Sequence, residues 1–559
     1  MAAHSHAAFG AVALLTSMLA LAAPDVPTGA EPAQSPPIQS SPVPSPVPSP
    51  VPSPAVQAPI VLVPEKNACD APGGAVATGS AQWNGWGRTL DNTRYQPEPA
   101  IRASDVGKLA LKWAYGYQSG TEFGQPTVVD GRLFLTSSSG RVYAVDAKTG
   151  CTYWTFDAPT AIRGPAIIGE LARGKVVALP RKIKRTLAHL DVIKAPSAVL
   201  FAGDGGWVYA LDAQKGALLW KTQVESHPLA RIGAAPVINA DRVYVAVGST
   251  EDRAALEPGY GCCTFRGSVV ALDIATGRQV WKSYTVLQEP VATRRTAEGV
   301  QEYGPAGAAI VAAPTIDVAR NSVYVATNGA PNGMEQSLTD AIVAFDLNDG
   351  KLRWVKQLVR GDAGPPGSGF SSSPVLRTLA TGSQVLLATQ KSGTVYALDP
   401  DHGGAVFWQT NAPGGGVGSG SAADHRCLYV ATSGLLAQPA NPAGALSALD
   451  LTTGATRWQI AVPMPACAWH EKSCSHGQAQ AVTVMPGAAL SGSLDGHIRA
   501  YSTIDGKILW DFDTAKDYAT RNAVEAAGGP LDRGGPTVVN GMVYLNSGNA
   551  LLAFTVEGK

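Results

Sequence analysis

From about residue 100 to its C-terminus, the chain repeats one pattern of apolar and polar positions. An alternating stretch such as GRVYAVD leads into a turn that contains Asp and Gly, and a second alternating stretch then ends in Trp. Alternation predicts β-strands, and the turn residues predict that each pair of strands forms a hairpin. Eight copies of this eleven- or twelve-residue pattern end at Trp113, Trp154, Trp220, Trp281, Trp354, Trp408, Trp458 and Trp510.

A second pair of short strands precedes most copies, for example QPTVVDGRLFLTSSSG before Trp154. A single hairpin is not stable in water, so these units must stack on one another, and the indole offers a large area to bury against a neighbour. Four short strands per repeat are typical of a propeller blade. The pattern therefore predicts an all-β fold, an eight-bladed β-propeller over residues 67–559.

The two ends of this region predict how the ring closes. The chain ends in MVYLNSGNALLAF, a strand pair without a following Trp, whereas the Trp113 copy has few strands before it. We expect the two ends to complete one blade together, which would leave no open sheet edge.

The first 66 residues differ from the rest in composition. Residues 1–23 contain an apolar run that ends in small residues, which predicts a signal peptide, with a membrane anchor as the alternative. Residues 24–66 include SPVPSPVPSPVPSP and predict a Pro/Ser-rich disordered linker that serves as a tether. These segments predict a periplasmic or secreted protein without stable membrane insertion.

Charge narrows the class of partner. Only 15% of the residues are charged, and 43 basic residues balance 43 acidic ones. Without a basic surplus we expect no nucleic-acid partner and instead a small or neutral one. The chain also has no C-x-x-C-H, H-E-x-x-H, phosphate-loop or G-x-S-x-G motif, which argues against covalent haem and against zinc-protease, nucleotide and serine-hydrolase chemistry.

The Trp repeat resembles the tryptophan-docking motif of the quinoprotein alcohol dehydrogenases, propellers that hold pyrroloquinoline quinone on the central axis with a calcium ion. The segments QWNGWGRTLDNTRYQ, CCTFRGSVVALD, QKSGTVYALDP and SGSLDGHIRAY are most similar to the polyvinyl alcohol dehydrogenase branch. The resemblance covers about residues 80–555 and implies oxidation of a secondary or polymeric alcohol. Because the chain carries no haem motif, electrons would pass to a soluble cytochrome c or another acceptor.

The resemblance also implies roles for particular residues. Arg163 in IRGP and Lys391 in QKSG match positions that contact the quinone, and Lys391 would also stabilise developing negative charge. Glu251 and Asn328 are the candidate calcium ligands, since calcium prefers oxygen donors. Asp362 in RGDAG is the candidate base, with a turn Asp as the alternative.

Seven cysteines fit an exported protein. A bond between neighbouring Cys262 and Cys263 would close almost no loop, so stability explains it poorly. In the resembling enzymes such a bridge lies flat on the quinone, and the alternative is two separate thiols. Cys69 is expected to reach Cys151, and Cys427 to be a buried thiol. The remaining pair lies in CAWHEKSCSH, which favours a disulfide or, alternatively, a zinc set from Cys467, His470, Cys474 and His476.

Three departures from the family pattern leave a second hypothesis open. Val311 stands where relatives carry a Trp beneath the quinone, ATNG replaces G-T-G-N, and no acid occurs from 364 to 374. The alternative is a cofactor-free propeller, either a protein-binding scaffold or a catalytically decayed paralogue.

Overall fold

The computed structural model describes residues 65–78, 81–120, 123–171, 197–334, 336–359, 369–412, 415–434, 444–463, 475, 477–532 and 534–559. The predicted signal peptide and nearly all of the predicted linker lie outside these residues and stay predictions. Within them, no helix combines the length and the apolar composition needed to cross a bilayer.

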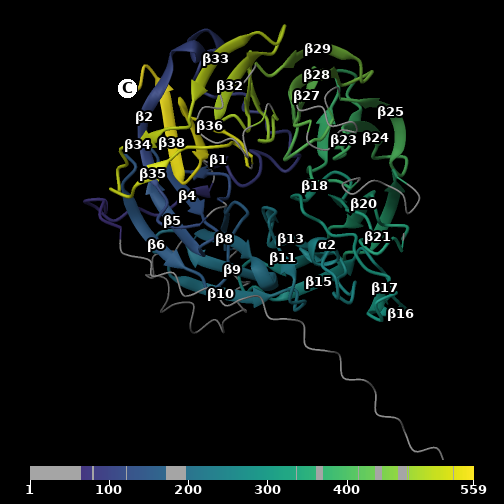
Figure 1. Ribbon diagram of the computed structural model, residues 1–559. Helices are drawn as coiled ribbons and strands as arrows, with labels where there is room; N and C mark the ends of the chain where they lie inside the picture. The colour runs from purple at the N-terminus through teal and green to yellow at the C-terminus, as the bar shows by residue number, and fades with distance from the viewer. Residues whose placement is uncertain are drawn as a thin grey trace, which may run out of the picture. The chain divides into compact units, whose positions relative to one another are not determined.

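The described residues form eight antiparallel sheets of four or five strands, which Figure 1 shows around a ring. The predicted eight-bladed propeller is thus confirmed. In the first five sheets in chain order, each list runs from the inner to the outer strand: β1 (Ala81–Trp83), β3 (Thr127–Val129), β4 (Arg132–Thr136), β5 (Arg141–Asp146) and β6 (Thr152–Asp157); β7 (Ile167–Glu170), β8 (Ser197–Gly203), β9 (Trp207–Asp212) and β10 (Leu218–Gln223); β12 (Val237–Asn239) with β11 (Ala230–Arg231), β13 (Arg242–Ser249), β14 (Ser268–Asp273) and β15 (Gln279–Tyr284); β18 (Thr315–Asp317), β19 (Ser322–Ala326), β20 (Ala341–Asp346) and β21 (Leu352–Gln357); β22 (Val375–Thr378), β23 (Gln384–Thr389), β24 (Thr394–Asp399) and β25 (Ala405–Asn411).

The other three sheets complete the ring. Their strands are β26 (Ala422–Ala423), β27 (Cys427–Thr432), β28 (Ala445–Asp450) and β29 (Thr456–Ala461); β30 (Thr483–Met485), β31 (Ala488–Gly492), β32 (His497–Ser502) and β33 (Ile508–Asp513); and β36 (Thr537–Val539), β37 (Met542–Ser547), β38 (Ala550–Val556) and β2 (Leu109–Gly116). Outside the blade sheets are the two-stranded pairs β16 (Val291–Arg295) with β17 (Gln301–Gly304) and β34 (Asp517–Tyr518) with β35 (Ala526–Ala527). The described residues also form three short helices: η2 (Ala103–Lys108) before β2, η3 (Asp204–Gly206) between β8 and β9, and α2 (Glu251–Ala254) between β13 and β14.

The last blade joins both ends of the propeller, as predicted. Strand β2 pairs along its length with β38, so the first Trp copy supplies the outer strand of the C-terminal sheet. One detail of the prediction was wrong: residues 103–108 form η2 rather than the first strand of a hairpin. The reason is that β38 already occupies the position beside β2, which leaves these residues without a strand partner.

The motif tryptophans tie each blade to the next. Seven of the eight donate their indole N–H to a backbone carbonyl of the following blade, at 3.0 to 3.2 Å; they are Trp113, Trp154, Trp220, Trp281, Trp408, Trp458 and Trp510. The indole also covers the turn glycine of that blade. At Gly277, where φ is +69°, an added Cβ would lie 2.4 Å from Trp220 Cε3. This glycine therefore serves both the left-handed turn and the close approach of the indole.

An N-terminal segment crosses the inner ends of five successive sheets. Backbone hydrogen bonds join Leu90 to Ile316, Asp91 to Leu376, Thr93 to Ala423 and Arg94 to Val484, and the Gln96 side chain donates to the Val538 carbonyl. This segment, residues 90–96, thereby touches β18, the start of β22, β26, β30 and β36. Its bonds fix the chain that precedes it, including Trp86, relative to the ring.

Two cysteine predictions away from the axis are confirmed. Cys69 and Cys151 form a disulfide with Cα atoms 5.1 Å apart, and this bond fastens the start of the described chain to the first blade. Cys427 is a buried free thiol in β27, and burial raises its pKa to about 11. The predicted Cys467–Cys474 disulfide and its zinc alternative lie outside the described residues.

Candidate active site

A cavity of about 440 Å³ opens at one end of the ring. Most of its walls come from loops that precede one strand in each of seven sheets, namely β3, β7, β12, β18, β22, β26 and β36. A space bounded by loops of so many blades lies on the axis of the ring, and we call it the axial cavity. Its volume is within the range of small-molecule sites.

The axial cavity brings together two residues that the sequence predicted to share a site. Arg163 stands before β7, and Lys391 lies in the turn between β23 and β24, yet both line the cavity. Arg231 and Arg253 also line it, whereas Asp252 is the only carboxylate among its described lining residues. This excess of positive charge suits an anionic ligand.

Both predicted cations also have partners in the protein. Arg163 Nε donates to Asp204 Oδ2 at 3.0 Å, and Lys391 Nζ donates to Asn328 Oδ1 at 3.2 Å. Burial lowers the pKa of Lys391, and the nearby carboxylates of Asp252 and Asp340 oppose this shift. Lys391 is thus a desolvated ammonium group that the Asn328 amide holds in place. Because it is desolvated, its interaction with any negative charge in the cavity is stronger than it would be in water.

Hydroxyl groups form another part of the wall. Ser371 donates to the Gly418 carbonyl at 2.8 Å, and Ser419 to the Asp532 carbonyl at 3.1 Å. Ser373 also lines the cavity and is only 5% exposed, and its Oγ has no hydrogen-bond partner among the described residues. An unpaired buried hydroxyl is unfavourable, so Ser373 is suited to bind a polar atom of a ligand.

The neighbouring cysteines form the disulfide that the sequence suggested. Cys263 is fully buried and Cys262 is 8% exposed, and they pack with Ala306, Ala255 and Tyr260. Neither sulfur belongs to the described lining of the axial cavity, but α2 connects the two places: Asp252 and Arg253 line the cavity, and Ala255 directly after the helix contacts the disulfide cluster. Contact with a bound quinone stays a prediction for this bridge.

Glu251 holds the loop that carries the disulfide. Its carboxylate is 1% exposed; Oε1 accepts from Thr264 N at 2.7 Å and Tyr260 Oη at 3.0 Å, and Oε2 accepts from Phe265 N at 2.9 Å. The neighbouring carboxylate and burial together raise the pKa of Tyr260, with burial as the larger cause. Thr264 Oγ1 also donates to Oε1, at 3.4 Å, so four donor groups already engage the first candidate calcium ligand. The second, Asn328, accepts from Lys391.

The other predicted site residues are distributed as follows. Val311 lines the axial cavity at 36% exposure, and Asp362 lies outside the described residues. Within the described ranges, no three His, Cys, Asp or Glu side chains form a group that could hold a metal ion.

Among the lining residues that sequence reasoning missed are Trp86, Gln125, Arg231 and Ser373. Trp86 lies in a segment that was recognised only for its similarity to the family, and Ser373 in the run SSSP. Their positions outside the repeat were the only sequence feature that set them apart.

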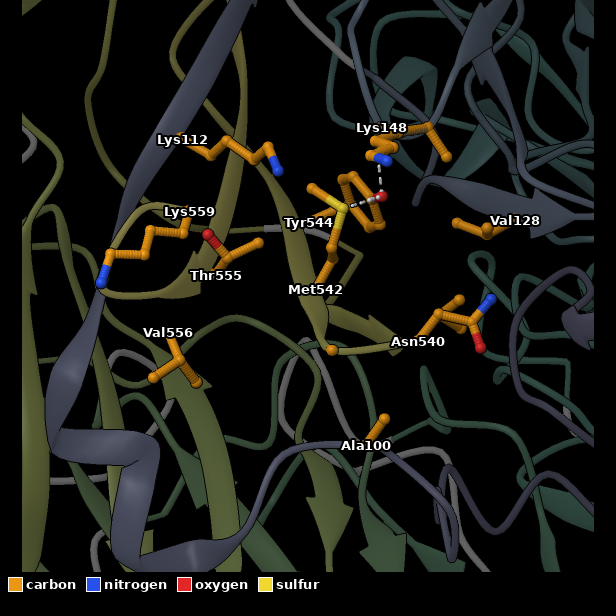
Figure 2. Close-up of a pocket in the computed structure, with 13 residues that line it drawn as sticks. Ala100, Lys112, Val128, Lys148, Asn540, Met542, Tyr544, Thr555, Val556 and Lys559 are labelled. Atoms are coloured by element: carbon orange, nitrogen blue, oxygen red, sulfur yellow. Dashed lines mark hydrogen bonds between the residues drawn. The ribbon is translucent and has the colours of Figure 1, made fainter.

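A second cavity, of about 480 Å³, lies where the first and last sheets meet. Figure 2 shows Lys112, Lys148 and Lys559 around it, with Tyr544 and Met542 between them. Tyr544 Oη donates to the Ala147 carbonyl at 2.7 Å, which ties the two sheets together. None of the predicted site residues lines this second cavity, so the axial cavity is the candidate active site.

Comparison with known proteins identifies the class to which this propeller belongs. The β-propeller domain of glucose, ethanol and alcohol dehydrogenases that use pyrroloquinoline quinone (PQQ) matches residues 83–418. A model described as outer membrane protein assembly factor BamB matches the shorter ranges 391–529 and 442–558. Among solved structures, quinohemoprotein alcohol dehydrogenase ADHIIG from Pseudomonas putida HK5 has the same fold, with a TM-score of 0.62, 18% identity and coverage of 86% of this chain and 81% of that one.

The curated relatives define the branch. A polyvinyl alcohol dehydrogenase from Pseudomonas sp. is 39% identical over 86% of this chain and 77% of its own length. Another from Sphingopyxis sp. (strain 113P3) is 37% identical over 88% of this chain and 79% of its own. The chain therefore belongs to the PQQ-dependent alcohol dehydrogenase family, in its polyvinyl alcohol dehydrogenase branch. Its class is that of the quinoprotein oxidoreductases, and the cofactor-free scaffold is not favoured.

Proposed function

We propose that the chain oxidises a secondary or polymeric alcohol, such as polyvinyl alcohol, with PQQ held in the axial cavity. The observation that carries this proposal is the convergence of Arg163, Lys391 and the unpaired Ser373 hydroxyl on one axial cavity. The residues fit the group, because PQQ is a planar polycarboxylate with two quinone oxygens and this wall offers cations and a free hydroxyl.

Each predicted residue has a separate task in this proposal. Arg163 binds a cofactor carboxylate, for which a guanidinium is well suited, and Lys391 directs its ammonium group at a quinone oxygen. When bound, PQQ would supply the acceptor for the two electrons that the alcohol loses as it becomes a carbonyl compound. Asp362 would accept the hydroxyl proton of the alcohol, and the Cys262–Cys263 disulfide would border the bound quinone.

The metal and the electron carrier are finer parts of the same proposal. Calcium, bound near Glu251 and Asn328, would act as a Lewis acid. Among the described residues, Oε2 of Glu251 accepts a single hydrogen bond, from Phe265 N, so this oxygen keeps acceptor capacity for a cation. A separate cytochrome c or similar carrier would accept the electrons, in the periplasm or outside the cell.

The direct test uses the purified mature protein with PQQ, with and without Ca²⁺. We expect a shift of the quinone absorbance on binding, and reduction of an artificial dye when polyvinyl alcohol or a small secondary alcohol is added. A Ca²⁺ requirement would support the metal site, and activity that is unaffected by chelation would remove calcium from the proposal. Failure to bind PQQ at tens of micromolar cofactor would refute the proposed function.

A further inference from the structure

The axial cavity lacks an aromatic side chain at position 311, where Val311 offers no stacking face to a planar ring. Only two aromatic residues occur among its described lining, Trp86 and Phe123. Phe123 is 9% exposed and stacks on Tyr117, with ring centroids 4.1 Å apart and an interplanar angle of 18°. Phe123 is therefore nearly buried within the protein, whereas Trp86 is half-buried and larger.

A fixed cation holds the indole of Trp86 in place. Arg94 Cζ lies 4.6 Å from the Trp86 ring centroid and 5.5 Å from that of Trp83. Arg94 is fully buried; it donates to the Val482 carbonyl at 2.6 Å and to Gln125 Oε1 at 2.7 Å, and burial lowers its pKa to about 9. A guanidinium with these bonds cannot move away, so the indole rests on a rigid support.

A glycine also lies close to the indole. A Cβ added at Gly420, two residues before β26, would lie 2.7 Å from Trp86 Cζ2. Any larger residue there would displace the ring. The N-terminal segment of residues 90–96, bonded across five sheets, adds a further restraint directly after Trp86.

We propose that Trp86 supplies the aromatic face on which the ring of the bound quinone stacks, from the N-terminal segment rather than from the loop that holds Val311. This inference rests on the proposed function, because it names the contact that the same cavity makes with PQQ. Stacking of a planar ring on a pre-positioned indole contributes to affinity without ordering a mobile side chain.

The test measures PQQ binding rather than turnover. Equilibrium dialysis in the presence of Ca²⁺ gives Kd for the wild type and for Trp86→Leu, Trp86→Phe and Gly420→Ala, and thermal unfolding checks that each variant is folded. We expect Kd to rise about tenfold or more in Trp86→Leu and by less than about threefold in Trp86→Phe, which keeps an aromatic ring. Gly420→Ala should also weaken binding, because its Cβ displaces the indole.

The control is Trp207→Phe, since Trp207 in β9 lies under Lys221 and outside the lining of the axial cavity. Unchanged affinity of folded Trp86→Leu would overturn the role of Trp86 while leaving the proposed function intact. If the wild type itself does not bind PQQ, both the role of Trp86 and the proposed function are refuted. Should Trp86→Leu not fold, Gly420→Ala decides: weaker binding supports the stacking role, and wild-type affinity overturns it.

Discussion

The ring of blades, joined through the motif tryptophans, and the axial cavity differ in what each blade contributes to them. In the ring, most blades repeat the same contacts, an indole N–H that donates to the next blade and a glycine beneath the indole. In the cavity, the blades contribute different residues, such as Arg163, Ser373 and Lys391. A repeated contact stabilises the joints of the ring in the same way, whereas binding an asymmetric ligand requires different residues from different blades at the axis.

The largest expected effect comes from a change in the cavity. Lys391→Ala should reduce PQQ-dependent turnover by about 10²- to 10³-fold, the loss typical of removing one group that stabilises developing charge. Its unfolding temperature should stay near that of the wild type, because Lys391 makes one side-chain hydrogen bond of 3.2 Å in the described structure. Steady-state dye reduction and thermal unfolding measure the two effects. Lys148→Ala, at the second cavity, is the control that should leave turnover unchanged. An equal fall of stability and activity in Lys391→Ala would assign this residue to the scaffold.

A change in the ring should act on stability instead. Gly277→Ala forces a side chain into φ +69° and places its Cβ 2.4 Å from Trp220, so we expect it to lose about 2–4 kcal/mol of unfolding free energy. Gly131→Ala is the matched control: its φ is +72°, but its Cβ would meet nothing within 4 Å, and it should lose only about 1–2 kcal/mol. Urea denaturation measures both. Equal losses in the two variants would show that the Trp220 indole moves aside and that its packing does not restrict the residue at position 277.

A change at Glu251 shows whether a residue beside the cavity lining acts on stability. Glu251 directly precedes the lining residue Asp252, but its carboxylate accepts hydrogen bonds from backbone N–H groups. Glu251→Gln turns an amide donor toward one of these groups, and we expect a loss of about 1–3 kcal/mol of unfolding free energy. Glu257→Gln, an exposed change six residues further along, should have no measurable effect. Unaltered stability of Glu251→Gln would contradict its role in holding the disulfide loop.

The smallest expected effect is a change of stability with pH that comes from the His497–Asp511 pair within one blade. His497 Nδ1 lies 2.6 Å from Asp511 Oδ1, and this hydrogen bond is the main cause that raises the pKa of His497. The stabilisation is therefore fully present below the unfolded value of about 6.5 and is lost as pH rises through the higher folded pKa. Because the pair is partly exposed, we expect less than about 1 kcal/mol. Unfolding temperatures from pH 5 to 9 should fall less steeply in His497→Gln; identical slopes would refute the contribution.

The fold could be predicted because its repeat is local. Eleven consecutive residues contain the strand alternation, the turn glycine and the docking Trp, so the number of blades and the shared last blade followed from counting. The exception was η2: whether residues 103–108 pair depended on β38, more than 400 residues away in the chain.

The candidate site was only partly predictable. Arg163 and Lys391 were found through their similarity to the family, and the structure places both in the axial cavity. Ser373 and Trp86 could not be found, because a run of serines and an N-terminal Trp acquire a role only where the loops converge. The structure also shows that the Glu251 carboxylate holds the disulfide loop through backbone N–H groups, a structural role that its residue type did not reveal.

The amino-acid sequence alone determined the blades, their number and the oxidoreductase family, since these depend on short-range periodicity and on ordered motifs. Only the tertiary structure decided which side chains face the axis together and which are already engaged by the protein. The physical reason is that strand formation is governed by neighbours in sequence, whereas a binding site depends on distances, burial and unsatisfied polar groups among residues that the chain brings together from separate blades.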